Sequence, residues 1–253
     1  MSVVPGVKRD HLLVIGAASM VLVGAIVAVI VHATRERSHV WPASSASNAT
    51  ELVVPHVNGS IALDGDLDDT GWLGNVARTG AFLDKNGDIA RPYSEARLTW
   101  GDGVLYLSLY AADEDIRATA TTADGPVWRD DSFHFVIDNG TNERIFDVSA
   151  SGVIADATRG SASAVGDQVR AAADVNWNGG VHVSREIDGT LNDSSDDDEE
   201  WALEIVIPFE AIGLKGEAGE RVRFAVHRCD SPKREPRVCA SWGERNPATL
   251  ILE

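Results

Sequence analysis

Short runs in which apolar and polar residues alternate fill most of the sequence after about residue 53. The clearest run is residues 132–138, where every second side chain is apolar, namely Phe133, Phe135 and Ile137. A period of two is the pattern of a β-strand with one buried face. Gly, Asp and Asn separate the runs, and apolar residues almost never recur at helical spacing. Because roughly ten such runs close most readily as two packed sheets, we predict an all-β fold, a two-sheet antiparallel β-sandwich.

An apolar segment precedes this part of the chain. Residues 12–31 form an uncharged run of 20 residues, which as a helix is long enough to cross roughly 30 Å of hydrocarbon. We predict a transmembrane signal anchor there, after a short cytoplasmic N-terminus (1–11) and before a flexible tether (32–52) and a β-sandwich domain (53–253) outside the cytoplasm. A cleaved signal peptide is the alternative and would make the domain secreted, although such peptides usually have only about 7–15 apolar residues.

The protein is strongly acidic. It carries a formal net charge of −17, and the part after residue 37 carries −19, because four basic residues oppose two acidic ones before that point. A nucleic acid requires clustered Lys and Arg, so we predict no nucleic-acid partner. An acidic surface is compatible with a neutral polymer such as a glycan, and solubility alone also explains it.

The only two cysteines, Cys229 and Cys239, flank a segment with two prolines that is typical of a hairpin loop. If the two strands are in register, the cysteines face each other across the ladder, and a disulfide between them stabilises the fold by roughly 2–3 kcal/mol. Two free thiols in a reducing compartment are the alternative. Two cysteines match no usual zinc site.

An aromatic residue and two carboxylates stand before the strand 132–138. Trp128 is followed by Asp130 and Asp131, and the strand itself carries His134 on its mixed face. A pyranose ring has an apolar C–H face that packs on indole and hydroxyl groups that need hydrogen bonds from carboxylate, amide or imidazole groups. The segment therefore indicates sugar binding, although a Trp at the start of a strand also serves as a plug over the end of a sandwich.

Five segments in a characteristic order resemble the family 9 carbohydrate-binding modules (CBM9) and their relatives in the DOMON-like β-sandwich group. The resemblance covers about 200 residues, from Pro55 to Leu252. The segments are Leu63–Trp72 with an Asp-Gly and a Trp, Ala96–Asp113 around a Trp and a turn, Trp128–Asp138, Gly189–Asn192 followed by Trp201–Phe209, and Phe224–Trp242.

The resemblance implies a sugar held between two tryptophans, and the matching positions are Trp128 and Trp242. It also implies a carboxylate on the strand, where this chain has His134, and amide side chains in the last hairpin, where it has His227 and Arg228. Imidazole keeps the hydrogen bonding but loses a fixed negative charge, so the family's preference for glucan chain ends does not transfer directly. For each histidine, a purely structural role is an equal alternative.

Aspartates have two predicted roles. Asp131 is a candidate to bind sugar hydroxyl groups, beside Trp128. Asp64, Asp66, Asp68 and Asp69 are candidates for holding a structural Ca²⁺, as members of the family often do, and ordinary turn chemistry explains them equally well.

The sequence thus predicts a non-catalytic carbohydrate-binding module that supports carbohydrate catabolism or attachment to cell-wall glycan, with glycan-active enzymes as partners. A glycoside-hydrolysing enzyme, or an accessory domain of one, is an alternative that needs a pair of carboxylates. A haem-binding DOMON-like redox domain is another, and it would need two histidine ligands from His134, His182 and His227, because Met1 and Met20 both lie outside the domain. Protein–protein adhesion by the sandwich is the last alternative function.

Overall fold

The computed structural model describes residues 50–160, 173–243 and 247–253. These residues form twelve strands, two short α-helices and one 3₁₀ turn. The elements are β1 (Glu51–Val54), α2 (Thr70–Leu73), β2 (Ala77–Arg78), β3 (Ser94–Gly101), β4 (Val104–Ala112), η1 (Val127–Arg129), β5 (Ser132–Asp138), β6 (Asn142–Ser149), β7 (Ile154–Gly160), β8 (His182–Asp188), β9 (Glu200–Pro208), α3 (Phe209–Ile212), β10 (Arg221–Asp230), β11 (Val238–Trp242) and β12 (Ala248–Leu252).

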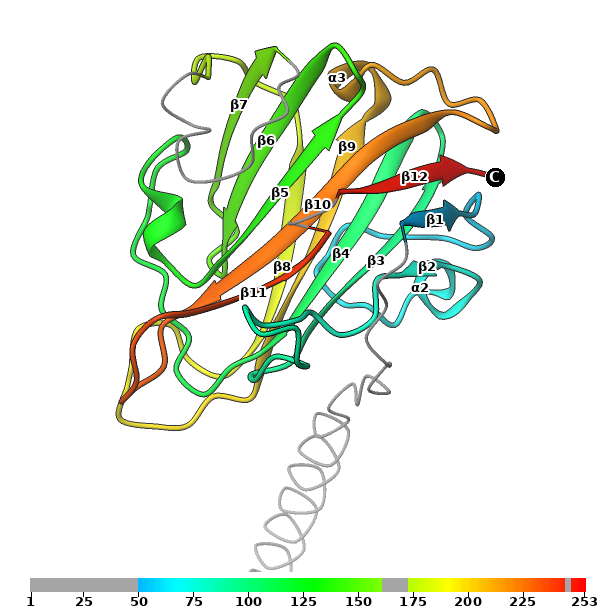
Figure 1. Cartoon of the computed structure of the whole chain (residues 1–253). Coiled ribbons are helices and arrows are strands. Elements are labelled where there is room, and N and C mark those ends of the chain that lie inside the picture. Colours follow the sequence, from blue (N-terminus) through cyan, green and yellow to red (C-terminus); the bar gives the residue numbers. More distant parts are fainter. Residues whose placement is uncertain (1–49, 161–172, 244–246) are drawn as a thin grey trace, which may run out of the picture. The chain divides into compact units, whose positions relative to one another are not determined.

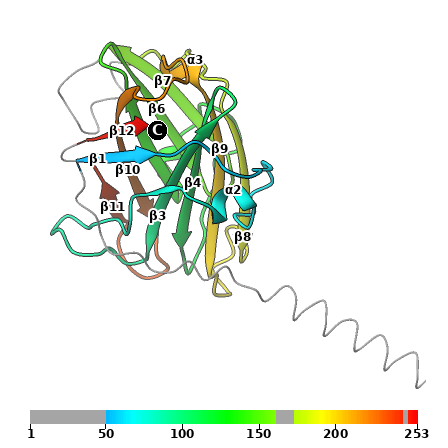
Figure 2. The same cartoon turned by 90° about the vertical axis from the view of Figure 1, so that its right-hand side faces the viewer.

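The strands make two packed sheets, as predicted (Figures 1 and 2). One sheet has seven strands in the order β1-β12-β10-β5-β6-β7, with β11 also paired to β10, and the other has five in the order β2-β3-β4-β9-β8. All pairs between these strands are antiparallel except β1 with β12, which is parallel. The all-β, two-sheet prediction is confirmed, with this one parallel edge as a difference.

The core lies between the two sheets because alternate residues of each strand point inward. Phe133, Phe135 and Ile137 of β5 are fully buried, as the alternation predicted. They meet the apolar faces of β4 and β9 from the other sheet within one hydrophobic cluster. Trp201 contacts Phe133 edge-on, with ring centroids 5.1 Å apart. The mixed side of β5 consequently faces away from the core, and this outer face carries the polar residues described below.

The predicted boundary between tether and domain falls inside a strand. Residues 51 and 52 were assigned to the tether, yet Glu51 and Leu52 pair with Thr249 and Leu250 of β12. No helix in the described ranges is long and apolar enough to cross a membrane. The predicted anchor 12–31 lies outside those ranges, as do segment 1–11 and most of the predicted tether.

Candidate functional site

Trp128 lies on the single turn η1, which contacts β5 and β6. Its neighbour Val127 is fully buried and fixes the turn to the sandwich, whereas Trp128 is 45% exposed. Among the exposed large hydrophobic residues of the described ranges, Trp128 is the one aromatic. An indole ring is thus presented to solvent on an anchored segment.

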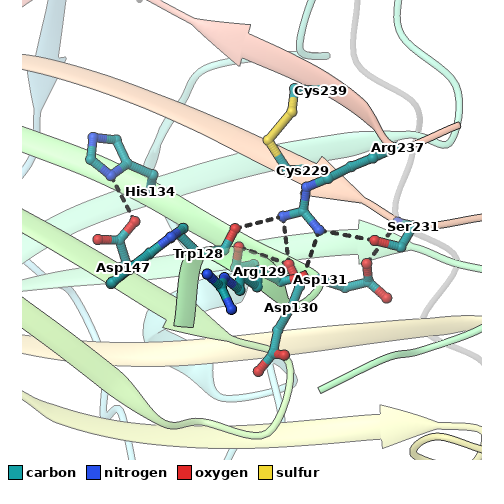
Figure 3. The surroundings of a disulfide bond; sticks show 11 residues. Trp128, Arg129, Asp130, Asp131, His134, Asp147, Cys229, Ser231, Arg237 and Cys239 are labelled. Carbon is teal, nitrogen blue, oxygen red and sulfur yellow. Dashed lines mark hydrogen bonds and ion pairs between the residues drawn. A yellow bond between two sulfur atoms is a disulfide. The ribbon is translucent and has the colours of Figure 1, made fainter. Parts of the chain in front are cut away.

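Arg237, from the loop between β10 and β11, holds this turn in place (Figure 3). Its guanidinium donates hydrogen bonds to the carbonyl oxygens of Trp128 at 3.0 Å, Arg129 at 2.9 Å and Asp130 at 2.6 Å. It also donates to Ser231 Oγ at 2.9 Å. One side chain thereby satisfies three consecutive carbonyl groups, so the backbone that carries Trp128 is fixed to the hairpin.

The two aspartates that follow Trp128 stabilise loops. The carboxylate of Asp130 accepts hydrogen bonds from the backbone N–H and hydroxyl of Thr119. Asp131 is fully buried, and its two oxygens accept backbone N–H groups of Arg117 and Ser231, each at 2.7 Å. Burial, and then the charge of a nearby aspartate, raises the pKa of Asp131 to about 6. The structure therefore places Asp131 beneath the turn, away from the surface predicted for it.

A row of polar residues crosses the outer face of the seven-stranded sheet. Asp147 of β6, His134 of β5, His227 of β10 and Ser241 of β11 are successive cross-strand partners. The His134 and His227 rings stack, with centroids 4.6 Å apart and an angle of 21° between planes. His134 Nδ1 donates to Asp147 Oδ1 at 2.8 Å. Figure 3 shows the His134–Asp147 hydrogen bond in the surroundings of the disulfide. The four neighbouring strands β6, β5, β10 and β11 each contribute one polar side chain to this row.

Trp242 does not face Trp128, contrary to the sequence-based expectation. It is 3% exposed and belongs to the hydrophobic core. Its partner across the ladder is Val226, whose side chain points inward, so Trp242 points inward too. Its ring lies 6.2 Å from that of Phe224. A sugar sandwiched between these two tryptophans is therefore not compatible with this arrangement.

Arg228 is also an interior residue. Its side chain is 2% exposed, and Nη2 donates to Asp113 Oδ2 at 2.7 Å and Asp230 Oδ1 at 2.9 Å. Nη1 donates to the carbonyl of Ala112 at 2.8 Å, and the guanidinium lies 5.8 Å from the Trp201 ring centre. All of these contacts are internal, so the structure gives Arg228 a stabilising role in place of the predicted ligand contact.

A pocket of about 450 Å³ lies between residues 84–94 and the β10–β11 hairpin. Its lining includes Arg91, Arg228 and Arg237, and the exposed aliphatic residues Ile89 and Val238. None of its lining residues is aromatic. The pocket therefore lacks the flat apolar surface on which a pyranose stacks.

No family model matches the sequence, and no curated protein matches it. Several solved structures share the fold. A protein from Bacteroides uniformis ATCC 8492 with a provisional description as carbohydrate-binding aligns with a TM-score of 0.59 and 17% identity, over 81% of this chain and 99% of its own. A CBM9 module from Caldicellulosiruptor kristjanssonii in complex with cellotriose aligns with a TM-score of 0.51 and 15% identity, over 80% of this chain and 93% of its own. A CBM9 module from the same organism in complex with glucose aligns with a TM-score of 0.51 and 16% identity, over 80% of this chain and 95% of its own.

The chain has the fold of the family 9 carbohydrate-binding modules. This confirms the fold that the five segments predicted. The Asp-Gly and Trp segment of the CBM9-like fold can now be explained by its contacts. Glu204, fully buried on β9, accepts hydrogen bonds from Trp72 Nε1 at 2.6 Å and Gly65 N at 2.6 Å. Gly65 has a φ of 101°, and a Cβ there would lie 2.3 Å from the backbone of Arg185, so only glycine fits this approach.

The aspartates of that segment do not fit a calcium site. Asp64 Oδ1 accepts the N–H of Asp66, Asp66 Oδ1 accepts that of Asp68, and Asp69 Oδ2 accepts that of Ala62. Ca²⁺ requires six to eight oxygen ligands that converge on one point. These side chains instead cap successive turns and form no convergent group in the described ranges.

One group of three convergent carboxylates does occur in the described ranges, from Asp113, Asp131 and Asp230, with oxygens within 4.8 Å of one another. Arg228 already donates to two of them, and both oxygens of Asp131 accept backbone N–H groups. The positive charge that such a cluster needs comes from the protein itself.

The three histidines considered as haem ligands do not form an axial pair. His182 lies on β8 of the other sheet, whereas His134 and His227 stack side by side on one face. Two axial ligands must approach one iron from opposite sides of the porphyrin. Parallel rings on adjacent strands cannot do so.

The predicted disulfide is present between Cys229 and Cys239, which are direct partners across the β10–β11 ladder. It lies next to the loop that carries Arg237. Sequence reasoning missed Arg237 and Asp147. The alternation around Phe146 and Val148 places Asp147 on the outer face, but the contact of Arg237 with η1 joins residues more than 100 positions apart, and no local pattern reports it.

Proposed function

We propose that the domain is a non-catalytic carbohydrate-binding module that binds a saccharide on the outer face at Trp128. The observation that carries the proposal is an exposed indole ring whose backbone is fixed by Arg237. A fixed aromatic surface binds without the entropic cost of ordering a loop. The CBM9-like fold supports the proposal, because the solved modules with this fold hold cellotriose and glucose.

The chemistry that we propose is stacking combined with hydrogen bonding. The apolar face of a pyranose would pack on the Trp128 ring, and the His134 and His227 rings would bond hydroxyl groups at its edge. A single aromatic surface contributes only about 0.5–1.5 kcal/mol beyond the area that it buries. We therefore expect weak binding that becomes useful when many copies act on one polymer.

Replacement of Trp128 with Ala tests this function. Loss of the stacking surface should weaken binding to cello-oligosaccharides or another glycan by about tenfold, measured by calorimetry after a glycan-array screen has identified the sugar. Because Trp128 is largely exposed, the free energy of unfolding should change by less than about 1 kcal/mol.

Leu73→Ala is the matched control, since Leu73 is also exposed (66%) but belongs to α2. It should leave binding unchanged. Equal glycan affinity in Trp128→Ala and the native chain would exclude Trp128 as the binding surface, and absence of any glycan ligand would overturn the function itself.

We further propose that the domain is displayed outside the membrane on the anchor predicted at residues 12–31, close to glycan-active enzymes and their polymers. The support is the length of the uncharged apolar run. Cell fractionation tests it. The chain should remain with membranes after washing at alkaline pH, and recovery in the soluble fraction with the N-terminus removed would favour a cleaved signal peptide.

A further inference from the structure

The Cys229–Cys239 disulfide lies on the outer face of the seven-stranded sheet, where solvent reaches it. Cys229 is partly exposed and Cys239 is exposed. On β10, Cys229 alternates with the buried residues Arg228 and Asp230, so it points outward. A thiolate reduces a disulfide by attacking one of its sulfur atoms, and this attack depends on access to the bond. The position of this disulfide provides that access.

The end of β11 next to the disulfide has little apolar anchoring of its own. Burial along β11 falls from Trp242, which lies in the core, to Val238 and Cys239, which are exposed. The last ladder pair is Asp230 with Val238, one position beyond the disulfide, and the hairpin loop follows. Because this end of the strand buries so little apolar surface, the covalent bond supplies much of what fixes it to β10.

Arg237 connects this end of β11 to Trp128. It lies two positions before Cys239, inside the loop that the disulfide closes, and its guanidinium donates hydrogen bonds to the carbonyl oxygens of Trp128, Arg129 and Asp130. Figure 3 shows the disulfide, Arg237 and these carbonyl groups together. The segment η1 is a single turn of three residues whose N-cap makes no side-chain hydrogen bond. Its position therefore depends on contacts from outside, and those of Arg237 come from the hairpin.

We propose that the redox state of the Cys229–Cys239 disulfide regulates saccharide binding at Trp128. On reduction by a dithiol the S–S bond breaks, both sulfur atoms become thiols by taking up two electrons and two protons, and the dithiol becomes a disulfide. The end of β11 then loosens and Arg237 holds η1 less firmly, so a sugar must order the turn at an entropic cost. The oxidised, binding form suits the location outside the cytoplasm proposed above. This regulation rests on the function proposed for Trp128.

Hydrogen exchange of the full chain in detergent tests the coupling without a sugar. The chain has only two cysteines, so dithiothreitol acts on this bond alone, and a thiol count confirms complete reduction. Backbone amides of residues 127–131 should exchange faster after reduction, and equally fast in the double variant Cys229→Ser, Cys239→Ser. Ile212→Val is the control, because it shortens a fully buried side chain on α3, away from the hairpin loop (Figure 1), and should leave exchange at 127–131 unchanged. Unchanged exchange after complete reduction would overturn the proposal, whether or not a glycan binds.

Calorimetry with cellotriose, or with the glycan that the array screen selects, measures the effect on binding. Reduction should weaken the affinity by about three- to fivefold, less than the loss in Trp128→Ala. The oxidised Arg237→Met variant should already bind this weakly, and its reduction should add nothing, because the disulfide and Arg237 act through the same contacts. A further loss of the same size on reducing Arg237→Met would overturn the route through Arg237. If Trp128→Ala binds as tightly as the native chain, the function proposed for Trp128 fails, and the exchange measurement still decides whether the disulfide controls the turn.

Discussion

The two faces of strand β10 carry polar residues in different surroundings, although these residues are adjacent in the sequence. On the inner face, Arg228 and Asp230 are buried, and Arg228 donates hydrogen bonds to both Asp230 and Asp113. On the outer face, His227 is partly exposed and stacks on another histidine. Both faces are polar at this end of the strand. The difference is burial: the inner charges are enclosed in the protein, whereas the outer rings are partly exposed to solvent.

The two predicted tryptophans follow the same division. Trp242 packs in the core beside Phe224, while Trp128 stands on a turn that Arg237 holds at the surface. The role of a polar or aromatic side chain in this region therefore depends on which face of the sheet carries it. Inner groups contribute to the stability of the sandwich, and the outer groups include the residues of the proposed sugar surface.

The largest effect is expected from replacing the inner cation. Arg228→Met leaves Asp113 and Asp230 buried without their shared donor, and removal of one partner from a buried ion pair costs about 3–5 kcal/mol. Urea unfolding followed by circular dichroism should show this loss. Arg223→Met is the matched control on the outer face of the same strand. Arg223 is 48% exposed, although its partner Asp138 is 6% exposed. Because solvent screens the guanidinium, we expect a smaller loss than in Arg228→Met. Equal losses in both variants would contradict the division between faces.

The sequence contained enough information to place Trp242 correctly. In the sequence, Phe224 and Val226 alternate with polar or small residues and therefore share a buried face, and the predicted disulfide places Cys229 opposite Cys239. These two statements together fix the register, which pairs Val226 with Trp242 and points both inward. The local pattern therefore predicts a core position for Trp242, whereas the resemblance to CBM9 implies a ligand contact, and the structure agrees with the local pattern.

Other features of the site could not be predicted from local pattern. Alternation and the Asn139-Gly140 turn between β5 and β6 indicate that Asp147 shares a face with His134, but not that the two bond. The contacts of Arg237 with η1, and of Arg228 with Asp113, depend on how distant loops and sheets pack. The fold follows from periodicity, whereas the site follows from packing at one end of the sandwich.

The smallest and most discriminating effect is the pH dependence of stability. Burial, with the charge of Asp113 opposing proton loss, raises the pKa of Asp230 above its usual 3.8. The folded chain therefore binds this proton more tightly than the unfolded chain, and its contribution to stability falls as pH rises from about 4 to neutral. His227 is the reverse case. Its pKa falls from 6.5 to about 3 on folding, so its contribution falls as pH decreases from about 6.5.

The two faces of β10 should consequently respond to pH in opposite directions. We expect His227→Phe to gain stability relative to the native chain between about pH 7.5 and pH 4.5, and Asp230→Asn to lose it over the same interval. Urea unfolding at the two pH values measures both differences. Leu73→Ala introduces no change in titration and should follow the native chain. A relative change of the same sign in His227→Phe and Asp230→Asn would contradict the difference between the two faces. The two variants respond oppositely to pH only if folding shifts the pKa values of His227 and Asp230 in opposite directions.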